Sequence, residues 1–130
     1  MSLKQHLEKL CGEIGIECPK IESEKGALLA INPEFSLTVH ALAPGFSLQS
    51  KIAPPPKTKR EDLFIYLMRA NFLGQGTGGA RIGMDADENF LTLSLGFSYD
   101  MDYQTFKESV EDFVNYVAYW REETTKFEEK

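Results

Sequence analysis

The glycine-rich run from Gly74 to Gly79 contains the residues of this 130-residue sequence that most directly suggest ligand chemistry. Gly74, Gly76 and Gly79 have the G-x-G-x-x-G spacing of dinucleotide-binding loops. Such loops follow a strand and open a helix, whose N-terminal amides hold the pyrophosphate. Here a helical pattern precedes the run and a strand pattern follows it, so the run meets the negative end of a helix dipole. This order favours a structural chain reversal, and it leaves a small nucleotide- or metabolite-binding enzyme as the alternative.

A second candidate is the acidic run that begins at Asp85. Asp85, Asp87 and Asn89 have the spacing of the first ligands in a calcium-binding loop. That loop also requires glycine at its sixth position and glutamate at its twelfth, where this sequence has Phe90 and Gly96. The run is therefore predicted to be a turn between two strands.

The histidines and cysteines complete the set of reactive side chains. His6 and His40 have no cysteine or carboxylate at a recognisable metal-ligand spacing. Cys11 and Cys18 are too few for a disulfide framework, and they lie where a helix ends, so the helix dipole disfavours their thiolate forms. The sequence therefore predicts no catalytic residues, no metal site and no cofactor. A redox role for the two thiols is left open.

Composition and charge exclude several further classes. The chain has 14 basic and 20 acidic residues, a net charge of −6 and no basic cluster, which argues against nucleic-acid binding. It contains no run of 18 apolar residues, so we expect no membrane insertion. The first residues lack the apolar core of a signal peptide, and we expect a cytoplasmic location. The length fits one domain, residues 1–130.

Three segments have the apolar periodicity of α-helices. The first, residues 2–14, begins with a Ser2–Gln5 capping box and has apolar residues at Leu3, Leu7, Leu10 and Ile14. The second begins at a Thr58–Glu61 capping box and ends at the glycine run. The third is capped by Asp100 or Asp102, and Glu122–Lys130 is expected to fray from its end. Its apolar stripe is Phe106, Val110, Phe113, Val117 and Trp120.

Five segments alternate like β-strands, and short turns join most of them. They are residues 25–31, 35–41, 46–52, a strand that contains Ile82 and Met84, and 90–97. Pro54–Pro56 cannot continue a strand ladder, so the third strand stops before them. The predicted fold is α+β, in the order α-β-β-β-α-β-β-α. It has a twisted, mostly antiparallel five-stranded sheet flanked by helices.

The second helix is apolar on two faces. One face carries Leu63, Tyr66, Leu67 and Ala70, and the other carries Phe64, Ile65, Met68 and Phe72. A helix that is apolar nearly all round is buried on both sides, but a domain of this size offers one core. We therefore predict a homodimer through the second set, with help from Ile82 or Met84.

The stretch around the glycine run also carries a family resemblance. The sequence of Ala70–Ala80, ANFLGQGTGGA, followed by Gly83-Met84-Asp85, strongly resembles the class I chaperones of bacterial type III secretion, the Tir chaperone family. Length, acidity and element order fit over essentially the whole chain. The resemblance implies a homodimer without catalytic activity that binds the N-terminal region of secreted effector proteins before export.

The resemblance also bears on the apolar residues that one small core cannot easily cover. Leu28, Ala30, Leu37 and Leu48 are candidate effector contacts on a surface that joins the first helix to the first three strands. An extended effector segment over apolar patches, with strand addition at the sheet edge, would use this surface. Which faces are core, which effectors bind, and whether the chain docks on the export ATPase are left open. A non-secretory dimeric adaptor with the same fold is a further alternative.

Overall fold

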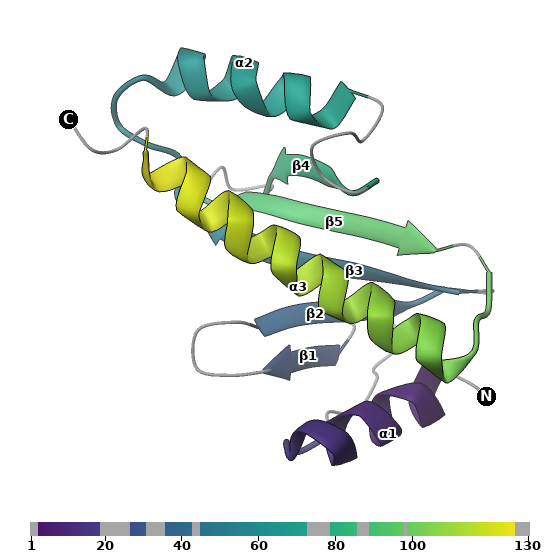
Figure 1. The fold of residues 1–130 in the computed structure, drawn as a ribbon. Coiled ribbons are helices and arrows are strands. Elements are labelled where there is room, and N and C mark those ends of the chain that lie inside the picture. Colours follow the sequence, from purple (N-terminus) through teal and green to yellow (C-terminus); the bar gives the residue numbers. More distant parts are fainter. Residues whose placement is uncertain are drawn as a thin grey trace. The chain divides into compact units, whose positions relative to one another are not determined.

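The computed structural model describes residues 3–18, 27–30, 36–42, 45–72, 79–85, 89–97 and 99–126. Its elements, in chain order, are α1 (Leu3–Ile14), β1 (Ala27–Ala30), β2 (Ser36–Ala41), β3 (Phe46–Ala53), α2 (Arg60–Asn71), β4 (Arg81–Met84), β5 (Leu91–Phe97) and α3 (Tyr103–Thr125). The predicted α-β-β-β-α-β-β-α order is confirmed, and so is the α+β class (Figure 1).

The five strands form one sheet in the order β1-β2-β3-β5-β4. The pairings of β1 with β2, of β2 with β3 and of β4 with β5 are antiparallel. Leu29 lies opposite Leu37, and Val39 lies opposite Leu48, so apolar residues of neighbouring strands share one face. The alternation seen in the sequence thus becomes one buried face on β2 and β3.

The chain forms two compact units. Unit 1 comprises Met1–Gln49 and Gly96–Asp112, and unit 2 comprises Ser50–Leu95 and Phe113–Lys130. The strands β3 and β5 and the helix α3 each contribute residues to both units.

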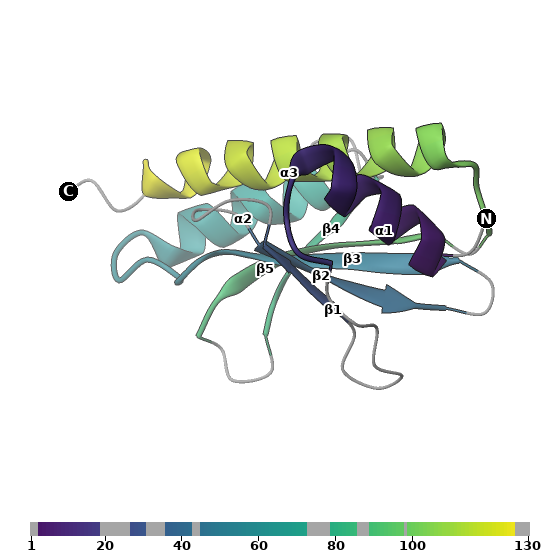
Figure 2. The same cartoon turned by 90° about the horizontal axis from the view of Figure 1, so that it is seen from below.

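The core of unit 1 lies between its helices and its strands. The view in Figure 2 shows α1 and the N-terminal half of α3 on the same side of β1 and β2. Its fully buried side chains include Leu7, Leu29, Val39, Leu48 and Phe106. The ring of Phe46 lies 4.9 Å from that of Phe97 and 5.2 Å from that of Phe106. These contacts join β3, β5 and α3.

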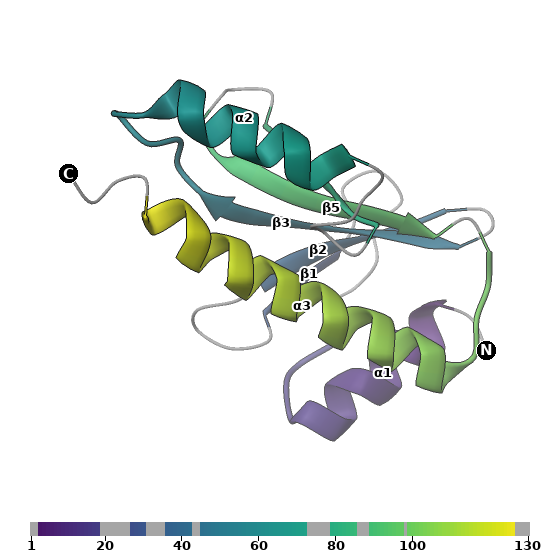
Figure 3. The same ribbon diagram turned by 45° about the horizontal axis from the view of Figure 1, so that its top comes forward.

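The core of unit 2 lies under α2 and the C-terminal half of α3. Figures 2 and 3 place both helices on the same side of β5. The buried side chains include Leu63, Leu67, Ile82, Leu91, Leu93, Phe113, Val117 and Trp120. Asn71 fastens the end of α2 to β4, because its Nδ2 donates to the Ile82 carbonyl at 2.8 Å and its Oδ1 accepts the Ile82 N–H at 2.7 Å.

The helix ends only partly follow the predictions. Ser2 lies outside the described residues, but Gly15 ends α1 as expected, with φ at +75° and its N–H bonded to the Cys11 carbonyl. Asp102 caps α3 through a 2.8 Å bond from the Thr105 N–H to its Oδ1.

Two predictions about helix ends are wrong. The Thr58–Glu61 capping box does not form, because Lys59, with φ at +58°, occupies the N-cap position and no side chain caps α2. Residues 122–125 do not fray, since α3 continues to Thr125. Thr124 is buried there, and the Glu123 carboxylate binds the Lys126 ammonium at 2.7 Å.

Candidate functional site

The outer face of α2 is apolar and uncovered within the described part of the chain. Leu63, Leu67 and Ala70 turn into unit 2 and are buried. The opposite side chains are exposed: Ile65 by 52%, Met68 by 72% and Phe72 by 66%. Phe64 is half-buried beneath the Arg60 guanidinium, which lies 5.6 Å from the centre of its ring. Several large apolar side chains exposed on one helix face are characteristic of an interface.

The two residues of β4 that were predicted to extend this face behave differently. Ile82 is buried, with Leu93 of β5 directly opposite it. Met84 is half-buried. Ile82 is therefore a core residue of unit 2, and Met84 is the one of the pair with accessible surface.

The structure divides the four candidate effector contacts between the two faces of the sheet. Leu28 is 63% exposed and Ala30 is also exposed. Leu37 and Leu48 are only 2% and 0% exposed, because β2 and β3 turn them into the core. Their assignment as partner contacts is corrected accordingly.

On the face that carries Leu28 and Ala30, the residues that lie opposite them on β2 are polar. Thr38 lies opposite Leu28 across the β1–β2 pair, and Gln49 lies opposite Thr38 on β3. Because β1 is the first strand in the sheet order, its outer edge has no strand partner among the described strands. Leu28 and Ala30 thus form a small apolar patch beside a strand edge, and such an edge can take up an extended chain.

The stretches considered for ligand chemistry have structural roles where they are described. Residues 74–78 of the glycine run lie outside the described residues, while Gly79 has φ at +92°. The Asp85 Oδ1 accepts the N–H groups of Asn89 at 2.8 Å and Phe90 at 3.2 Å, which confirms a turn between β4 and β5. The described residues contain no cluster of three or more potential metal ligands.

His6 and Cys11 are both buried side chains of α1. His6 is buried and stacked on Phe106 at 5.1 Å, and its Nε2 donates to the Met101 carbonyl at 2.7 Å. The position of His6 next to Leu7 is the one feature of the sequence that points to this burial. Burial, together with a hydrogen bond that the Cys11 thiol donates to Cys18, raises the pKa of Cys11 to about 11, which opposes its action as a nucleophile.

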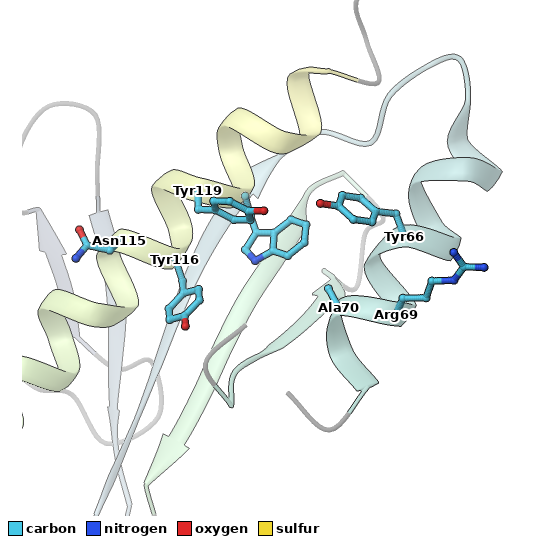
Figure 4. Close-up of a pocket in the computed structure, with 7 residues that line it drawn as sticks. Tyr66, Arg69, Ala70, Asn115, Tyr116 and Tyr119 are labelled. Atoms are coloured by element: carbon cyan, nitrogen blue, oxygen red, sulfur yellow. The ribbon is translucent and has the colours of Figure 1, made fainter. Parts of the chain in front are cut away.

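A pocket between α2 and α3 was not predicted from the sequence. It has a volume of about 640 Å³ and is lined by Tyr66, Arg69, Ala70, Asn115, Tyr116, Tyr119 and Trp120 (Figure 4). We call it the α2–α3 pocket. All of its lining residues belong to unit 2. The sequence signal was the cluster of aromatic residues at positions 116, 119 and 120, which share one side of a helix.

Glu123 organises the hydroxyl groups at one end of this pocket. Its Oε1 accepts the Tyr66 hydroxyl at 3.2 Å and the Tyr119 hydroxyl at 2.8 Å. The hydrogen bond to Lys126 is the main reason why the pKa of Glu123 is lowered. The bond to Glu123 in turn raises the pKa of Tyr119. The carboxylate is therefore charged and already supplied with donors.

Comparison with known proteins identifies the family. The sequence profile of the Tir chaperone protein (CesT) family matches residues 5–121, and the chain belongs to this family. A Chlamydia pneumoniae protein, CPj0713/CpB0740, is 34% identical over 68 residues, a stretch that covers 52% of each chain. The match thus spans about half the length of that curated relative. The predicted resemblance is confirmed.

Solved structures share the fold. A chain of the ExsC–ExsE complex superposes with a TM-score of 0.77 at 16% identity, covering 94% of this chain and 96% of its own. A chain of the HopA1–SchA chaperone–effector complex gives 0.69 at 15% identity, with 92% of each chain covered. A chain of the heterodimeric ExoU–SpcU complex from the type III secretion system of Pseudomonas aeruginosa gives 0.61 at 14% identity, covering 97% and 94%. None of the described helices is long and apolar enough to cross a membrane.

Proposed function

We propose that this chain is a type III secretion chaperone. It binds the N-terminal region of one or more effector proteins in the cytoplasm and keeps that region soluble and competent for export. The observation that carries the proposal is the family match over residues 5–121. The fold similarity to chains of complexes described as chaperone–effector and type III secretion assemblies supports it. In this proposal residues 1–130 act as one chaperone domain.

The proposed assembly is a homodimer through the outer face of α2. Phe64, Ile65, Met68 and Phe72 supply its apolar contacts, with Met84 beside them and Ile82 supporting β4 from the core. Ile65, Met68 and Phe72 each leave more than half of their surface in water in the single chain, which is unfavourable unless another surface covers them.

The proposed effector site is the outer edge of β1, with Leu28 and Ala30 beside it. An extended segment added there would pair its backbone with the free strand edge. Every second side chain of that segment would lie on the face that carries Leu28. The proposal leaves open whether the chaperone–effector pair docks on the export ATPase.

The proposed function includes no catalysis. The support is local: the pKa of Cys11 is raised, His6 is committed to a backbone carbonyl, and Asp85 is committed to two backbone amides. The nucleotide-binding alternative predicts that ATP or NAD stabilises the protein by about 2.7 kcal/mol at 100 times its Kd. Gly76→Val and Gly78→Val would remove that stabilisation. We expect no nucleotide stabilisation to be present in the wild type.

Purification of the tagged chain from its native cell tests the function directly. We expect a secreted protein to co-purify as a stable complex, and its N-terminal segment to be protected from limited proteolysis. Deletion of that segment should abolish co-purification, and deletion of the chaperone should reduce secretion of the partner. If the stable partner is not secreted, the chain is the non-secretory adaptor instead.

A further inference from the structure

The α2–α3 pocket has rigid aromatic walls. Trp120 is only 1% exposed, and the ring of Tyr66 lies 5.5 Å from it across the gap between the helices. The ring of Tyr119 packs on Trp120 at 5.1 Å and at 90°. Because Glu123 holds the hydroxyl groups of Tyr66 and Tyr119, these two rings cannot easily rotate to fill the pocket.

The wall of the pocket that α2 supplies includes a small side chain, Ala70. Ala70 and Tyr116 lie on opposite sides of the pocket (Figure 4). A volume of about 640 Å³ accommodates an aromatic side chain and part of the chain that carries it. Aromatic rings prefer to stack or meet edge to face with other rings, which the face of Tyr116 permits.

The charge at the rim favours an acidic neighbour for that ring. Arg69 is the only charged residue among those that line the pocket, and it is exposed. The nearby Glu123 carboxylate is compensated by Lys126 and by two tyrosine hydroxyl groups. A guanidinium group pairs well with a carboxylate. Arg69 would therefore attract an acidic side chain at the rim and repel a basic one.

The rim also offers a group suited to a peptide backbone. Asn115 of α3 is exposed, and its amide can both donate and accept a hydrogen bond. A peptide in extended conformation presents a carbonyl and an N–H to such an amide. The combination of an aromatic socket, one cation and one amide thus suits a peptide segment.

We propose that the α2–α3 pocket binds an aromatic side chain of an extended peptide segment in which an acidic residue flanks the aromatic one. The aromatic ring enters between Ala70 and Tyr116, and the acidic residue pairs with Arg69. The inference rests on the proposed function in one respect, since it assigns the segment to the secreted partner. The residues involved are distinct from Leu28 and Ala30.

Trp120 is the only tryptophan of the chain, so its fluorescence reports directly on this pocket. The probes are three acetylated and amidated five-residue peptides with serine and glycine at the ends. One has phenylalanine next to aspartate, one has alanine in place of the phenylalanine, and one has lysine in place of the aspartate. We expect a saturable change in Trp120 emission with the first, and affinities at least tenfold lower for the other two.

Variants locate the binding. Ala70→Leu should fill the pocket and lower the affinity for the first peptide at least tenfold. Ala118→Leu makes the same change on α3 outside the lining residues and should leave the affinity unchanged. Arg69→Glu should reverse the preference between the aspartate and lysine peptides, which remains decisive even where Ala70→Leu fails to fold. The absence of a saturable response in the wild type, or of the reversal in Arg69→Glu, would overturn the inference.

The purified secreted partner separates this inference from the proposed function. If that partner binds the wild type, Ala70→Leu and Arg69→Glu equally well, the pocket inference is wrong and the chaperone function stands. If the peptides behave as expected but no secreted partner is found, the pocket stands and the proposed function fails. If Ala70→Leu stays folded but changes the oligomeric state, the pocket is a subunit contact and the inference is overturned.

Discussion

Cys11 and Cys18 are close in sequence but differ in what surrounds them. Cys11 lies on the buried side of α1, whereas Cys18 is half-buried beyond the helix end. Burial disfavours a thiolate, and the hydrogen bond with Cys18 adds to the effect, so the pKa of Cys11 rises to about 11. The reactivity of each thiol is therefore determined by how deeply its side chain is buried.

We expect alkylation to distinguish the two thiols. With a pKa near 11, Cys11 is about 0.1% thiolate at pH 8, and its side chain is inaccessible. Iodoacetamide should add one group, at Cys18, in the native protein and two groups in denaturant. Peptide mass spectrometry measures this, and labelling of Cys11 should increase as the pH approaches 11. Equal labelling rates in the native protein at pH 8 would contradict the assignment.

Gly45 is a position where no other residue fits. Its φ is +96°, and an added Cβ would lie 1.9 Å from the Phe97 carbonyl oxygen. Gly45→Ala should therefore lower the free energy of unfolding by roughly 2–4 kcal/mol. Gly12→Ala is the matched control, because Gly12 lies within α1 and an added Cβ there meets no atom within 4 Å. It should stabilise the protein by about 0.5–1 kcal/mol. Urea denaturation checks both, and similar changes for the two variants would refute the steric argument.

At the scale of the helices, the start of α3 depends on a charged cap. Asp102 caps α3 through the Thr105 N–H, and this bond is the main reason why the pKa of Asp102 is lowered. A carboxyl group whose pKa is lower in the folded state stabilises the fold above its ordinary pKa of 3.8. That stabilisation is lost as the pH falls through the folded pKa.

Asp102→Ala should accordingly lower the melting temperature at pH 7 more than Asp100→Ala does. Asp100 is exposed, and Met101 separates it from Asp102, the residue that caps the helix. The difference between the two variants should shrink below pH 4, where the wild-type carboxylate becomes protonated. Thermal melts followed by circular dichroism measure the trend. An undiminished difference at low pH would show that the cap does not depend on charge.

The exposed face of α2 leads to a prediction for the assembly. Met68→Glu should produce monomers or aggregates, because a charge in an apolar interface is costly unless it is paired. Leu42→Glu is the matched control, since Leu42 is an exposed apolar residue of unit 1 outside α2. Sedimentation velocity at micromolar concentration gives the readout. A wild-type protein that sediments as a monomer under these conditions would exclude the dimer.

At the scale of the whole molecule, the apolar periodicity of the sequence predicted the order of the helices and strands and the class of the sheet. The alternation in β2 and β3 and the stripe in α3 are strong and local, so element order and sheet class followed from them. Periodicity gives two faces for each strand but does not say which face the chain covers. That is why Leu37 and Leu48 were grouped with Leu28, although the fold turns them to the opposite side.

The remaining errors concern contacts between distant residues. The α2–α3 pocket depends on Ala70 lying opposite residues about 45 positions further along the chain, and no local pattern contains that pairing. Likewise, the continuation of α3 to Thr125 depends on Tyr66 and Lys126 holding Glu123. The charged composition of residues 122–130 suggested a solvated end, and long-range contacts overrode that suggestion.

The strands β1 and β2 have one buried face and one exposed face, and the last prediction concerns binding of the secreted partner to the exposed face. Leu28→Asp should leave the fold intact, because the side chain is 63% exposed, but it should weaken binding of the secreted partner. Leu37→Asp should unfold the protein, because an unpaired buried carboxylate costs several kcal/mol and Leu37 is 2% exposed. Melting temperature and partner pull-down, measured on both variants, separate the two effects.

Gln49→Asp supplies the control for charge alone, since Gln49 is exposed on the same face and lies two strands away from Leu28. If Leu28→Asp and Gln49→Asp weaken binding equally, the partner is repelled by added negative charge in general, and Leu28 makes no specific contact. If Leu28→Asp stays folded and retains the partner fully, the partner does not occupy the β1 edge. The contact would then have to lie on other surfaces, and the α2–α3 pocket would be the next one to test by Ala70→Leu.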